Sequence, residues 1–235
     1  MYNRAVDLKG TIQSVIGQTY ENFEYIIVDG GSTDGTLDLI NDYKKNIDIS
    51  ISEPDKGIYD AMNKGLSLAK GTYVYFLNAG DSFTSDEIID QVSKQIDDTN
   101  SPSLICGQLK TTRGTIHPKA NWILNSRIKK TLPHQALFIK KEKHPPFDLK
   151  FKIAADFNML LQFFNSPEKT VFLDIPIANY DVLKLDKTKK EHQKYNILRS
   201  KEKAIICWSK LSGPSKLFSS IFYLIHYIKY SLKSA

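Results

Sequence analysis

Cysteine is scarce in this 235-residue sequence, and several common binding motifs are absent. The two cysteines, Cys106 and Cys207, lie far apart, form no CxxC pair and have no clustered histidines nearby, so neither a disulfide framework nor a structural zinc site is expected. No GxGxxG fingerprint and no GxxxxGK[ST] loop occurs, which disfavours a dehydrogenase-type dinucleotide fold and a P-loop. If the protein binds phosphate groups, it must do so without either of these glycine-rich loops.

Long apolar runs are missing as well. The first ten residues, MYNRAVDLKG, contain no apolar core, which argues against a secretory signal and predicts a cytoplasmic protein. The most membrane-like stretch, residues 217–230, is shorter than the roughly 18–20 apolar residues that a spanning helix needs. Its apolar residues recur at helical spacing with lysines near the ends, which predicts an amphipathic helix lying on the inner face of the cell membrane. The alternative is a helix packed on the main domain or on a second subunit of a homo-oligomer.

Charge is present but unevenly distributed. The net charge is +6, the acidic residues dominate the first hundred positions, and lysine and arginine concentrate between positions 184 and 233. This asymmetry predicts a main domain over residues 1–182 and a basic helical extension over residues 183–235 that faces an anionic partner such as a membrane surface or nucleic acid. Nothing in the front half resembles a nucleic-acid-binding element, so no nucleic-acid partner is expected.

Short β-branched runs alternate with helical stretches in the first half. Strands are expected at 25–28, 47–52 and 73–77, with helices at 36–43 and 58–69 between them. Such alternation implies βαβ crossovers and an α/β fold with a mostly parallel sheet flanked by helices. Farther on, the pattern predicts helices at 85–96, 154–164 and 187–211, strands at 104–106, 136–139 and 170–175, and irregular or hairpin structure at 108–121.

Two carboxylates follow predicted strands. Asp29 comes after the first and Asp81 after the third. Ligands of open parallel sheets bind beyond the carboxyl ends of the strands, so both side chains are expected in that crevice. One carboxylate could contact a nucleotide's base or ribose and the other a divalent cation on a diphosphate. A helix cap or an Asx turn is the alternative for each aspartate.

Four segments together carry a resemblance to a known family: EYIIVDGGSTDGT, SEPDKGIYDAMNKGLSLAKGTYVYFLNAGD, PHQALF and AADFNMLL. They resemble family 2 glycosyltransferases of the GT-A fold, near bacterial enzymes of exopolysaccharide or colanic-acid-type synthesis. The resemblance covers residues 2–180. It implies inverting transfer of a sugar from a nucleotide-sugar donor, with UDP the expected nucleotide, to a saccharide or lipid-linked acceptor in surface polysaccharide synthesis. A divalent cation, Mg²⁺ or Mn²⁺, usually assists in this family.

The resemblance also implies roles for particular residues. Asp156 would be the catalytic base, with Ala155 where the family has a first acidic residue, while His134 and Gln135 would line the acceptor or diphosphate side. The donor-binding residues would be Tyr2, Asn3, Asp29, Asp60, Asn63, Asn78 and Asp81. Asp81 would also be the metal ligand. The family typically has Asp-x-Asp followed by another Asp here, whereas residues 78–81 of this sequence read Asn-Ala-Gly-Asp, so only one carboxylate is present and metal dependence stays open. Ordinary structural roles are the alternatives: a first-turn aspartate for Asp156, a solvated helix face for Asn63 and a structural histidine for His134.

One family feature is not found. Relatives have an apolar strand before the tyrosine and asparagine, whereas this sequence starts at Met1-Tyr2-Asn3, so the first strand of the sheet is apparently missing. Its loss would expose the hydrogen-bonding edges of two neighbouring strands. A shortened chain, a substitute segment and a damaged relative all fit this observation. Two other functions therefore stay open: a non-catalytic nucleotide-binding or scaffold relative, and a nucleotidyltransferase.

Overall fold

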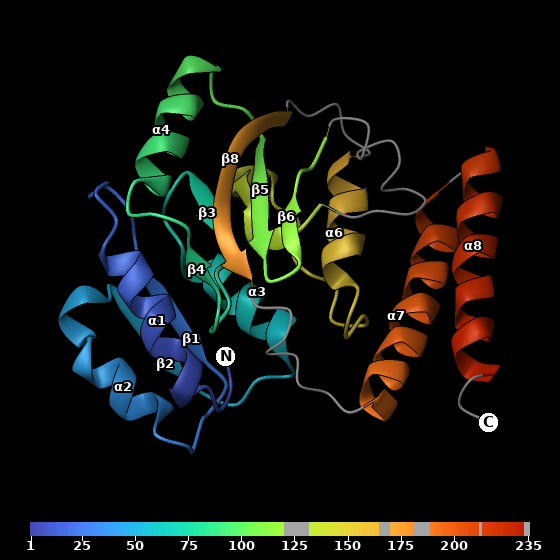
Figure 1. Cartoon of the computed structure of the whole chain (residues 1–235), viewed down its shortest axis with the longest axis horizontal. Coiled ribbons are helices and arrows are strands. Elements are labelled where there is room, and N and C mark those ends of the chain that lie inside the picture. The colour runs from blue at the N-terminus through green and yellow to red at the C-terminus, as the bar shows by residue number, and fades with distance from the viewer. Residues whose placement is uncertain (120–131, 165–169, 181–188, 212, 233–235) are drawn as a thin grey trace.

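Two β-sheets form the centre of the computed structural model, which describes residues 1–119, 132–164, 170–180, 189–211 and 213–232. The smaller sheet pairs β1 (Ile26–Asp29) with β2 (Ile49–Ser52). The larger sheet has the order β3 (Tyr73–Tyr75), β7 (Leu137–Lys140), β5 (Leu104–Thr111), β8 (Thr170–Tyr180) and β4 (Ser82–Phe83), while β6 (Gly114–Ile116) pairs with β5. Figure 1 shows the smaller sheet beside the larger one, with helices around both.

The helices account for most of the remaining described chain. They are α1 (Ala5–Ile16), α2 (Thr36–Asp42), α3 (Ile58–Leu68), α4 (Ile88–Asp98), α6 (Ala155–Phe164), α7 (Lys189–Lys210) and α8 (Gly213–Leu232). Short 3₁₀ turns occur at Lys44–Asn46, His134–Ala136 and Lys141–Lys143. These bounds lie within a few residues of most predicted elements. The last strand differs more, because β8 continues through Pro176 to Tyr180.

The α/β class is confirmed, but the sheet is mixed rather than mostly parallel. Among the described strands, β1–β2 and β5–β8 pair in parallel, whereas β3–β7, β4–β8, β5–β6 and β5–β7 are antiparallel. A parallel pair needs a long crossover between its strands, and the sequence alternates strand and helix regularly only up to β3. Beyond that point the chain also makes a tight hairpin, in which Thr111 faces Gly114 across β5 and β6.

Alternating side chains of the larger sheet build two cores. On β5, Leu104 and Cys106 pack into a cluster with Met62 of α3 and Met159 of α6. The intervening Ile105 belongs to a second cluster that includes side chains of α1 and α4. This period of two is what a strand covered by helices on both faces requires. The sheet is therefore fixed between α3 and α6 on one face and α1 and α4 on the other.

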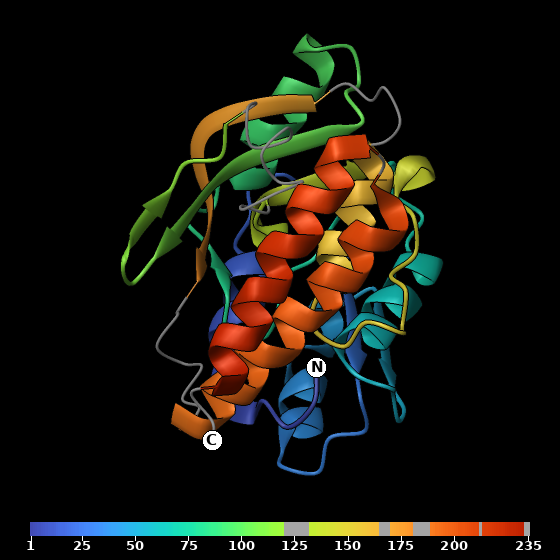
Figure 2. The same cartoon turned by 90° about the vertical axis from the view of Figure 1, so that its right-hand side faces the viewer.

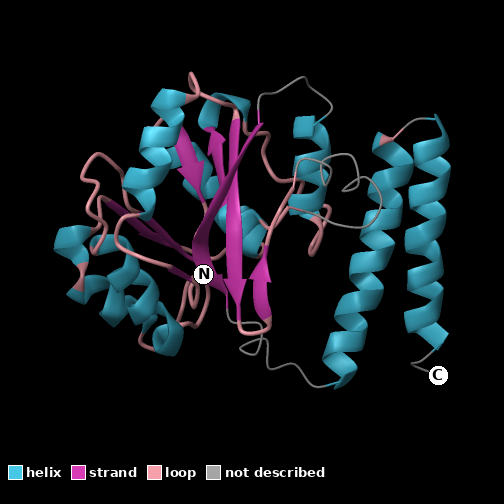
Figure 3. Ribbon diagram, turned by 45° about the horizontal axis from the view of Figure 1, so that its top comes forward, coloured by secondary structure: helices cyan, strands magenta, loops and turns pink. Residues whose placement is uncertain are grey.

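Helices α7 and α8 form an antiparallel pair on the outer side of α6 (Figures 1 and 2). Ile206 of α7 and Tyr223 of α8 pack with Phe157 and Leu161 of α6 in a third apolar cluster. Figure 3 shows the same two helices beyond α6, away from the smaller sheet. The predicted division between residues 1–182 and 183–235 falls outside the described residues.

Met1 lies where a strand would continue the smaller sheet. Its amino group donates to the Val28 carbonyl at 2.7 Å, and the Gly30 N–H donates to the Met1 carbonyl at 2.6 Å. This is the hydrogen-bond pattern of a parallel strand, here reduced to one residue. Among the described strands, β1 pairs only with β2 and β3 only with β7, so each has one edge without a strand partner in the described part of the chain. A cavity of about 1200 Å³ touches both residues 26–28 and residues 73–77, so it reaches the edges of both strands.

Candidate active site

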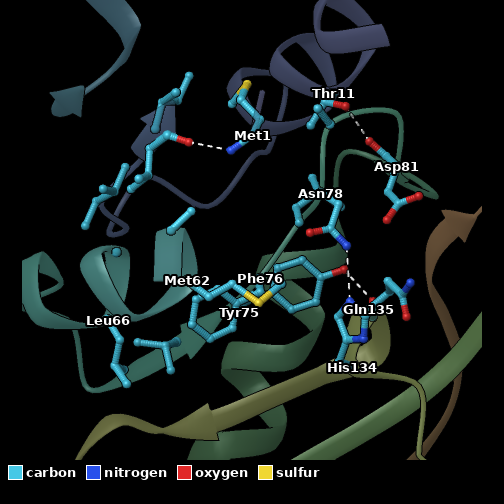
Figure 4. A pocket seen from close by; sticks show the side chains of 18 of the residues that line it. Met1, Thr11, Met62, Leu66, Tyr75, Phe76, Asn78, Asp81, His134 and Gln135 are labelled. Carbon is cyan, nitrogen blue, oxygen red and sulfur yellow. Dashed lines mark hydrogen bonds between the residues drawn. The ribbon is translucent and has the colours of Figure 1, made fainter. Parts of the chain in front are cut away.

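Six of the predicted site residues line this single cavity: Tyr2, Asn78, Asp81, His134, Gln135 and Asp156. They come from segments far apart in the sequence: the chain start, the turn after β3, the 3₁₀ turn before β7 and the first turn of α6. Figure 4 shows side chains of the turn after β3 and of the 3₁₀ turn directed toward one another. The fold therefore gathers most of the predicted polar groups on one wall.

Asn78, His134 and Asp156 form a polar chain along that wall. The Asn78 Nδ2 lies 3.1 Å from the His134 Nε2, as Figure 4 shows, and the His134 Nδ1 lies 3.5 Å from the Asp156 Oδ2. When the Asn78 amide donates to Nε2, a neutral imidazole carries its proton on Nδ1, facing Asp156. The His134 and Asp156 side chains are 21% and 22% exposed, so both are accessible from the cavity.

The second oxygen of Asp156 is held by its own surroundings. Its Oδ1 accepts the Phe157 N–H at 2.8 Å and lies 3.2 Å from the Tyr59 hydroxyl, which donates to the Ile153 carbonyl at 2.9 Å. Burial raises the pKa of Asp156, but His134, Lys203 and the Phe157 N–H more than offset it, so the pKa lies below its ordinary value. Asp156 is therefore a carboxylate near neutral pH, as a proton acceptor must be.

Helix α7 reaches the same site, which sequence reasoning did not predict. Tyr195 lines the cavity, and Glu202 accepts the backbone N–H groups of residues 152–154 at 2.8–2.9 Å. Burial lowers the pKa of Lys203 to about 8, while the nearby Asp156 carboxylate raises it. The sequence contained no distinct signal for these residues, because they lie in the basic helical extension, which was expected to face an anionic partner.

The turn that carries Asp81 is fixed by α1. The Thr11 hydroxyl donates to the Asp81 carbonyl at 2.7 Å and accepts the Gly80 N–H at 2.9 Å, and the Asp81 N–H donates to the Asn78 carbonyl at 3.0 Å. Gly80 has a φ of 100°, a left-handed conformation that favours glycine. The Asp81 side chain consequently stays at the cavity wall although it is 5% exposed.

The donor set fits a cation that also takes ligands from its substrate. Hard cations prefer oxygen, and Mg²⁺ in particular binds through one or two carboxylates together with phosphate oxygens and water. Asp81 and the amide oxygen of Asn78 are oxygens of this kind in a single turn. Within the described ranges, no group of three or more His, Cys, Asp or Glu residues is placed to hold a metal. The residues present thus suit a cation bound together with a diphosphate.

Asp29 lies apart from this cavity wall. It is completely buried, and its carboxylate accepts the Gly31 N–H at 3.0 Å, the Ser32 N–H at 2.8 Å, the Ser32 hydroxyl at 2.5 Å and the Ser52 hydroxyl at 2.7 Å. Burial opposes ionisation, but these hydrogen bonds outweigh it and hold the pKa of Asp29 below its ordinary value. These hydrogen bonds stabilise the turn after β1, which is the Asx-turn alternative that the sequence left open. A contact between Asp29 and the sugar donor stays a prediction.

Three further predicted donor contacts also lie off the cavity and bind backbone groups. Asn63 donates to the Phe147 carbonyl and accepts the Phe147 N–H, both at 2.9 Å, although 84 positions separate the two residues. The Asn3 Oδ1 accepts the Thr33 N–H at 2.9 Å, and the Asp60 Oδ2 accepts the Lys56 N–H at 3.0 Å just before α3. The structure therefore supplies a role for each side chain without a ligand.

Comparisons with known proteins identify the family and the fold. The family described as Glycosyl transferase family 2 matches residues 1–147. A "PGL/p-HBAD biosynthesis glycosyltransferase" of Mycobacterium bovis is 30% identical over 187 residues, covering 76% of this chain and 73% of the relative. Among solved structures, S. aureus TarS 1–349 in complex with UDP-GlcNAc has a TM-score of 0.71 at 17% identity, covering 100% of this chain and 74% of that one.

A second solved structure is the mannosyltransferase PcManGT from Pyrobaculum calidifontis in complex with GDP-Man and Mn²⁺. Its TM-score is 0.69 at 15% identity, covering 99% of this chain and 71% of that one. At these identities the two structures establish the fold alone, and the fold is that of GT-A glycosyltransferases. The family match and the sequence relative decide among the three functions left open. The chain is a glycosyltransferase and belongs to glycosyl transferase family 2.

Proposed function

We propose that the protein is an inverting glycosyltransferase that moves a sugar from a nucleoside diphosphate donor, UDP-linked in the first instance, to an acceptor hydroxyl. The observation that carries this proposal is the position of Asp156, an accessible carboxylate in the same cavity as Asn78 and Asp81. The UDP-GlcNAc complex of TarS and the GDP-Man complex of PcManGT support a nucleotide-sugar donor.

The proposed reaction is a single displacement. The Asp156 Oδ2 accepts the proton of the acceptor hydroxyl while that oxygen attacks the anomeric carbon from the face opposite the diphosphate. The bond from the anomeric carbon to the diphosphate oxygen breaks, and the nucleoside diphosphate leaves with the bonding electrons. His134 holds the carboxylate by its Nδ1 side, and the backbone N–H of Phe157 holds the other oxygen. One carboxylate is enough for this chemistry.

Substitution of Asp156 tests the assignment. Asp156→Asn keeps the side-chain size but removes the proton acceptor, so kcat is expected to fall by about 10²–10⁴-fold while donor binding stays within about twofold. Asp98→Asn, on the exposed end of α4, is the matched control and should keep wild-type kcat. Transfer can be followed by release of nucleoside diphosphate, with the anomeric configuration of the product read by NMR. Near-normal turnover of Asp156→Asn, or a retained anomeric configuration, would reject the mechanism.

A divalent cation, Mg²⁺ or Mn²⁺, is proposed as the cofactor. When bound, it would neutralise the diphosphate of the leaving group, with Asp81 as the protein carboxylate and Asn78 beside it. Calorimetry should show tight Mn²⁺ binding only when the nucleoside diphosphate is present, and Asp81→Asn should weaken that binding at least tenfold. Metal-independent nucleotide binding and transfer in the wild type would contradict the proposal.

The acceptor is proposed to be a saccharide or lipid-linked sugar of a surface polysaccharide or glycolipid, presented at the cytoplasmic face of a membrane. The M. bovis relative, named for PGL/p-HBAD biosynthesis, supports this class. So does an exposed apolar face on the C-terminal helix pair, composed of Ile205, Trp208, Leu217, Phe218, Ile221, Leu224, Ile225 and Ile228. Lys216 lies over the Trp208 ring at 4.4 Å, and Lys201 and Lys210 are exposed on α7, so the face carries positive charge suited to anionic headgroups. No helix in the described ranges is long and apolar enough to span a bilayer.

Vesicle flotation tests this attachment. The protein should float with vesicles that contain anionic phospholipid and remain unbound to zwitterionic vesicles, and Ile221→Asp should release it. Trp208→Ala should weaken binding by a smaller amount. If the protein instead stays off all vesicles and elutes as a dimer that Ile221→Asp dissociates, the face is a subunit interface and the membrane proposal is wrong.

A further inference from the structure

Glu202 of α7 holds the backbone that leads into α6. Its Oε1 accepts the Lys152 N–H at 2.8 Å, and its Oε2 accepts the N–H groups of Ile153 and Ala154, both at 2.9 Å. The side chain is 5% exposed, so these are buried, charge-assisted hydrogen bonds. α6 begins at Ala155, so Glu202 binds the N–H of the residue just before the helix, Ala154, and those of the two residues before it. A carboxylate at this end also complements the helix dipole. A residue 48–50 positions away therefore fixes the start of α6.

The segment held by Glu202 is the one that sets the position of Asp156. Asp156 follows Ala154 by two residues, and the Ile153 carbonyl accepts the hydroxyl of Tyr59, which also approaches the Asp156 Oδ1. A displacement of this backbone would move both the carboxylate and one of its neighbours. Since the distance from Asp156 to His134 is already 3.5 Å, a small shift would separate the pair.

The next residue of α7, Lys203, places a cation against the aromatic ring that follows Asp156 in α6. The Lys203 Nζ lies 4.5 Å from the centroid of the Phe157 ring and 5.6 Å from that of the Tyr223 ring. Cation–π contacts of this kind keep an ammonium group within an aromatic environment instead of in water. Phe157 is adjacent to Asp156 in α6, and the charge of Lys203 favours the ionised form of that carboxylate.

We propose that α7 is part of the catalytic apparatus, with Glu202 positioning Asp156 through the backbone before α6 and Lys203, held against the Phe157 ring, acting on Asp156 through its positive charge. This inference rests on the proposed function, in which Asp156 is the base. It assigns a positioning residue and an electrostatic residue to a helix whose charge pattern by itself predicts only a basic surface. Neither side chain is required to touch the sugar donor, so their effects should fall on kcat rather than on donor affinity.

Glu202→Gln tests the positioning role. The variant keeps the side-chain size but loses the charge and one acceptor oxygen, so kcat is expected to fall about 10–100-fold with the donor KM within twofold. The amide protons of residues 152–154 should exchange with solvent at least tenfold faster than in the wild type. Glu191→Gln, at an exposed position on the same helix, is the matched control and should leave all three quantities unchanged. A variant that is less stable but keeps wild-type kcat in its folded fraction would overturn the positioning role.

Lys203→Met tests the electrostatic role with a side chain of similar length. The base works when deprotonated, so activity is lost as the pH falls through the pKa of Asp156, which the wild type holds below its ordinary value. Removal of the cation raises this pKa, so the acid limb of the kcat profile should move to higher pH, and Lys194→Met, exposed on α7, should leave it in place. An unchanged acid limb in Lys203→Met would overturn the electrostatic role.

A direct titration separates failure of this inference from failure of the proposed function. The carboxyl ¹³C resonance of Asp156 can be followed with pH in the wild type, Glu202→Gln and Lys203→Met, without any turnover. If the wild type transfers no sugar but Lys203→Met raises the pKa of Asp156 and Glu202→Gln speeds amide exchange at residues 152–154, the coupling to α7 stands and the assigned reaction fails. If the wild type transfers sugar and neither variant changes that pKa or kcat, the coupling is wrong. Should Glu202→Gln fail to fold, Lys203→Met still decides the outcome.

Discussion

An apolar strand joined to Met1 is expected to stabilise the protein by filling the space between β1 and β3. The perturbation is a five-residue extension, Val-Thr-Val-Ile-Val, placed directly before Met1. Met1 already makes the two hydrogen bonds of a parallel partner of β1, so preceding residues would run along residues 26–28. The cavity there is lined by apolar side chains such as Val15, Met62 and Val92. Burial lowers the pKa of the Met1 ammonium, so its replacement by an amide also removes the desolvation of a charge.

The size of the stabilisation follows from the hydrogen bonds and apolar contacts that the added strand would form and from the entropy lost when its residues become ordered. About five ladder hydrogen bonds contribute roughly 1 kcal/mol each. About three buried apolar side chains contribute roughly 2 kcal/mol each. Fixing the five residues costs roughly 1.5 kcal/mol each in conformational entropy, which leaves a net gain of about 3 kcal/mol. For a domain of this size that gain corresponds to a rise in Tm of about 6–12 °C.

Thermal unfolding of three matched proteins is the assay. One carries the apolar extension, one a Gly-Ser extension of equal length, and one the apolar extension with proline at its centre, which cannot donate to a ladder. Hydrogen exchange should show slower exchange of amide protons in β1 and β3 only for the first. The reasoning is refuted if the apolar extension changes Tm no more than the Gly-Ser extension does, or if the central proline leaves its effect intact.

Three further outcomes are expected. Asp29→Ala leaves Ser32 and neighbouring donors without their buried acceptor, so it should lower the free energy of unfolding in urea by about 3–5 kcal/mol. The pKa of Asp29 lies below its ordinary 3.8, so the wild type should also lose stability as the pH falls below about 4. Asp29→Asn should lose less stability over the same pH range. Gly107→Ala would force a Cβ into the Ile177 side chain and should lower the free energy of unfolding by at least about 1–3 kcal/mol. An unchanged Tm would show that β5 and β8 can move apart at little cost. Asn63→Ala should cost about 1–3 kcal/mol through the backbone of Phe147 with the donor KM unchanged, and a raised KM at full stability would instead restore Asn63 as a donor contact.

The candidate site could be predicted in part because the order of strands and helices limits where polar residues at their ends can lie. Asn78 and Asp81 follow β3, His134 precedes β7 and Asp156 opens α6, so the order of elements brings them to one cavity. Asp29, Asp60 and Asn63 carry the same residue types in similar positions. Whether such a side chain faces a ligand or its own backbone depends on distances of a few ångströms, which spacing along the chain does not encode.

The sequence by itself determined the α/β class, the alternation of strand and helix in the first half and the amphipathic C-terminal helices, because these follow from local periodicity of side chains. Only the tertiary structure decided that the sheet is mixed, that a cavity borders β1 and β3, and that α7 binds the backbone in front of α6. Glu202 meets residues 152–154 across some fifty positions of chain. A contact of that kind depends on how α6 and α7 pack, and a local pattern reports which face of a helix is apolar but not which element will cover it.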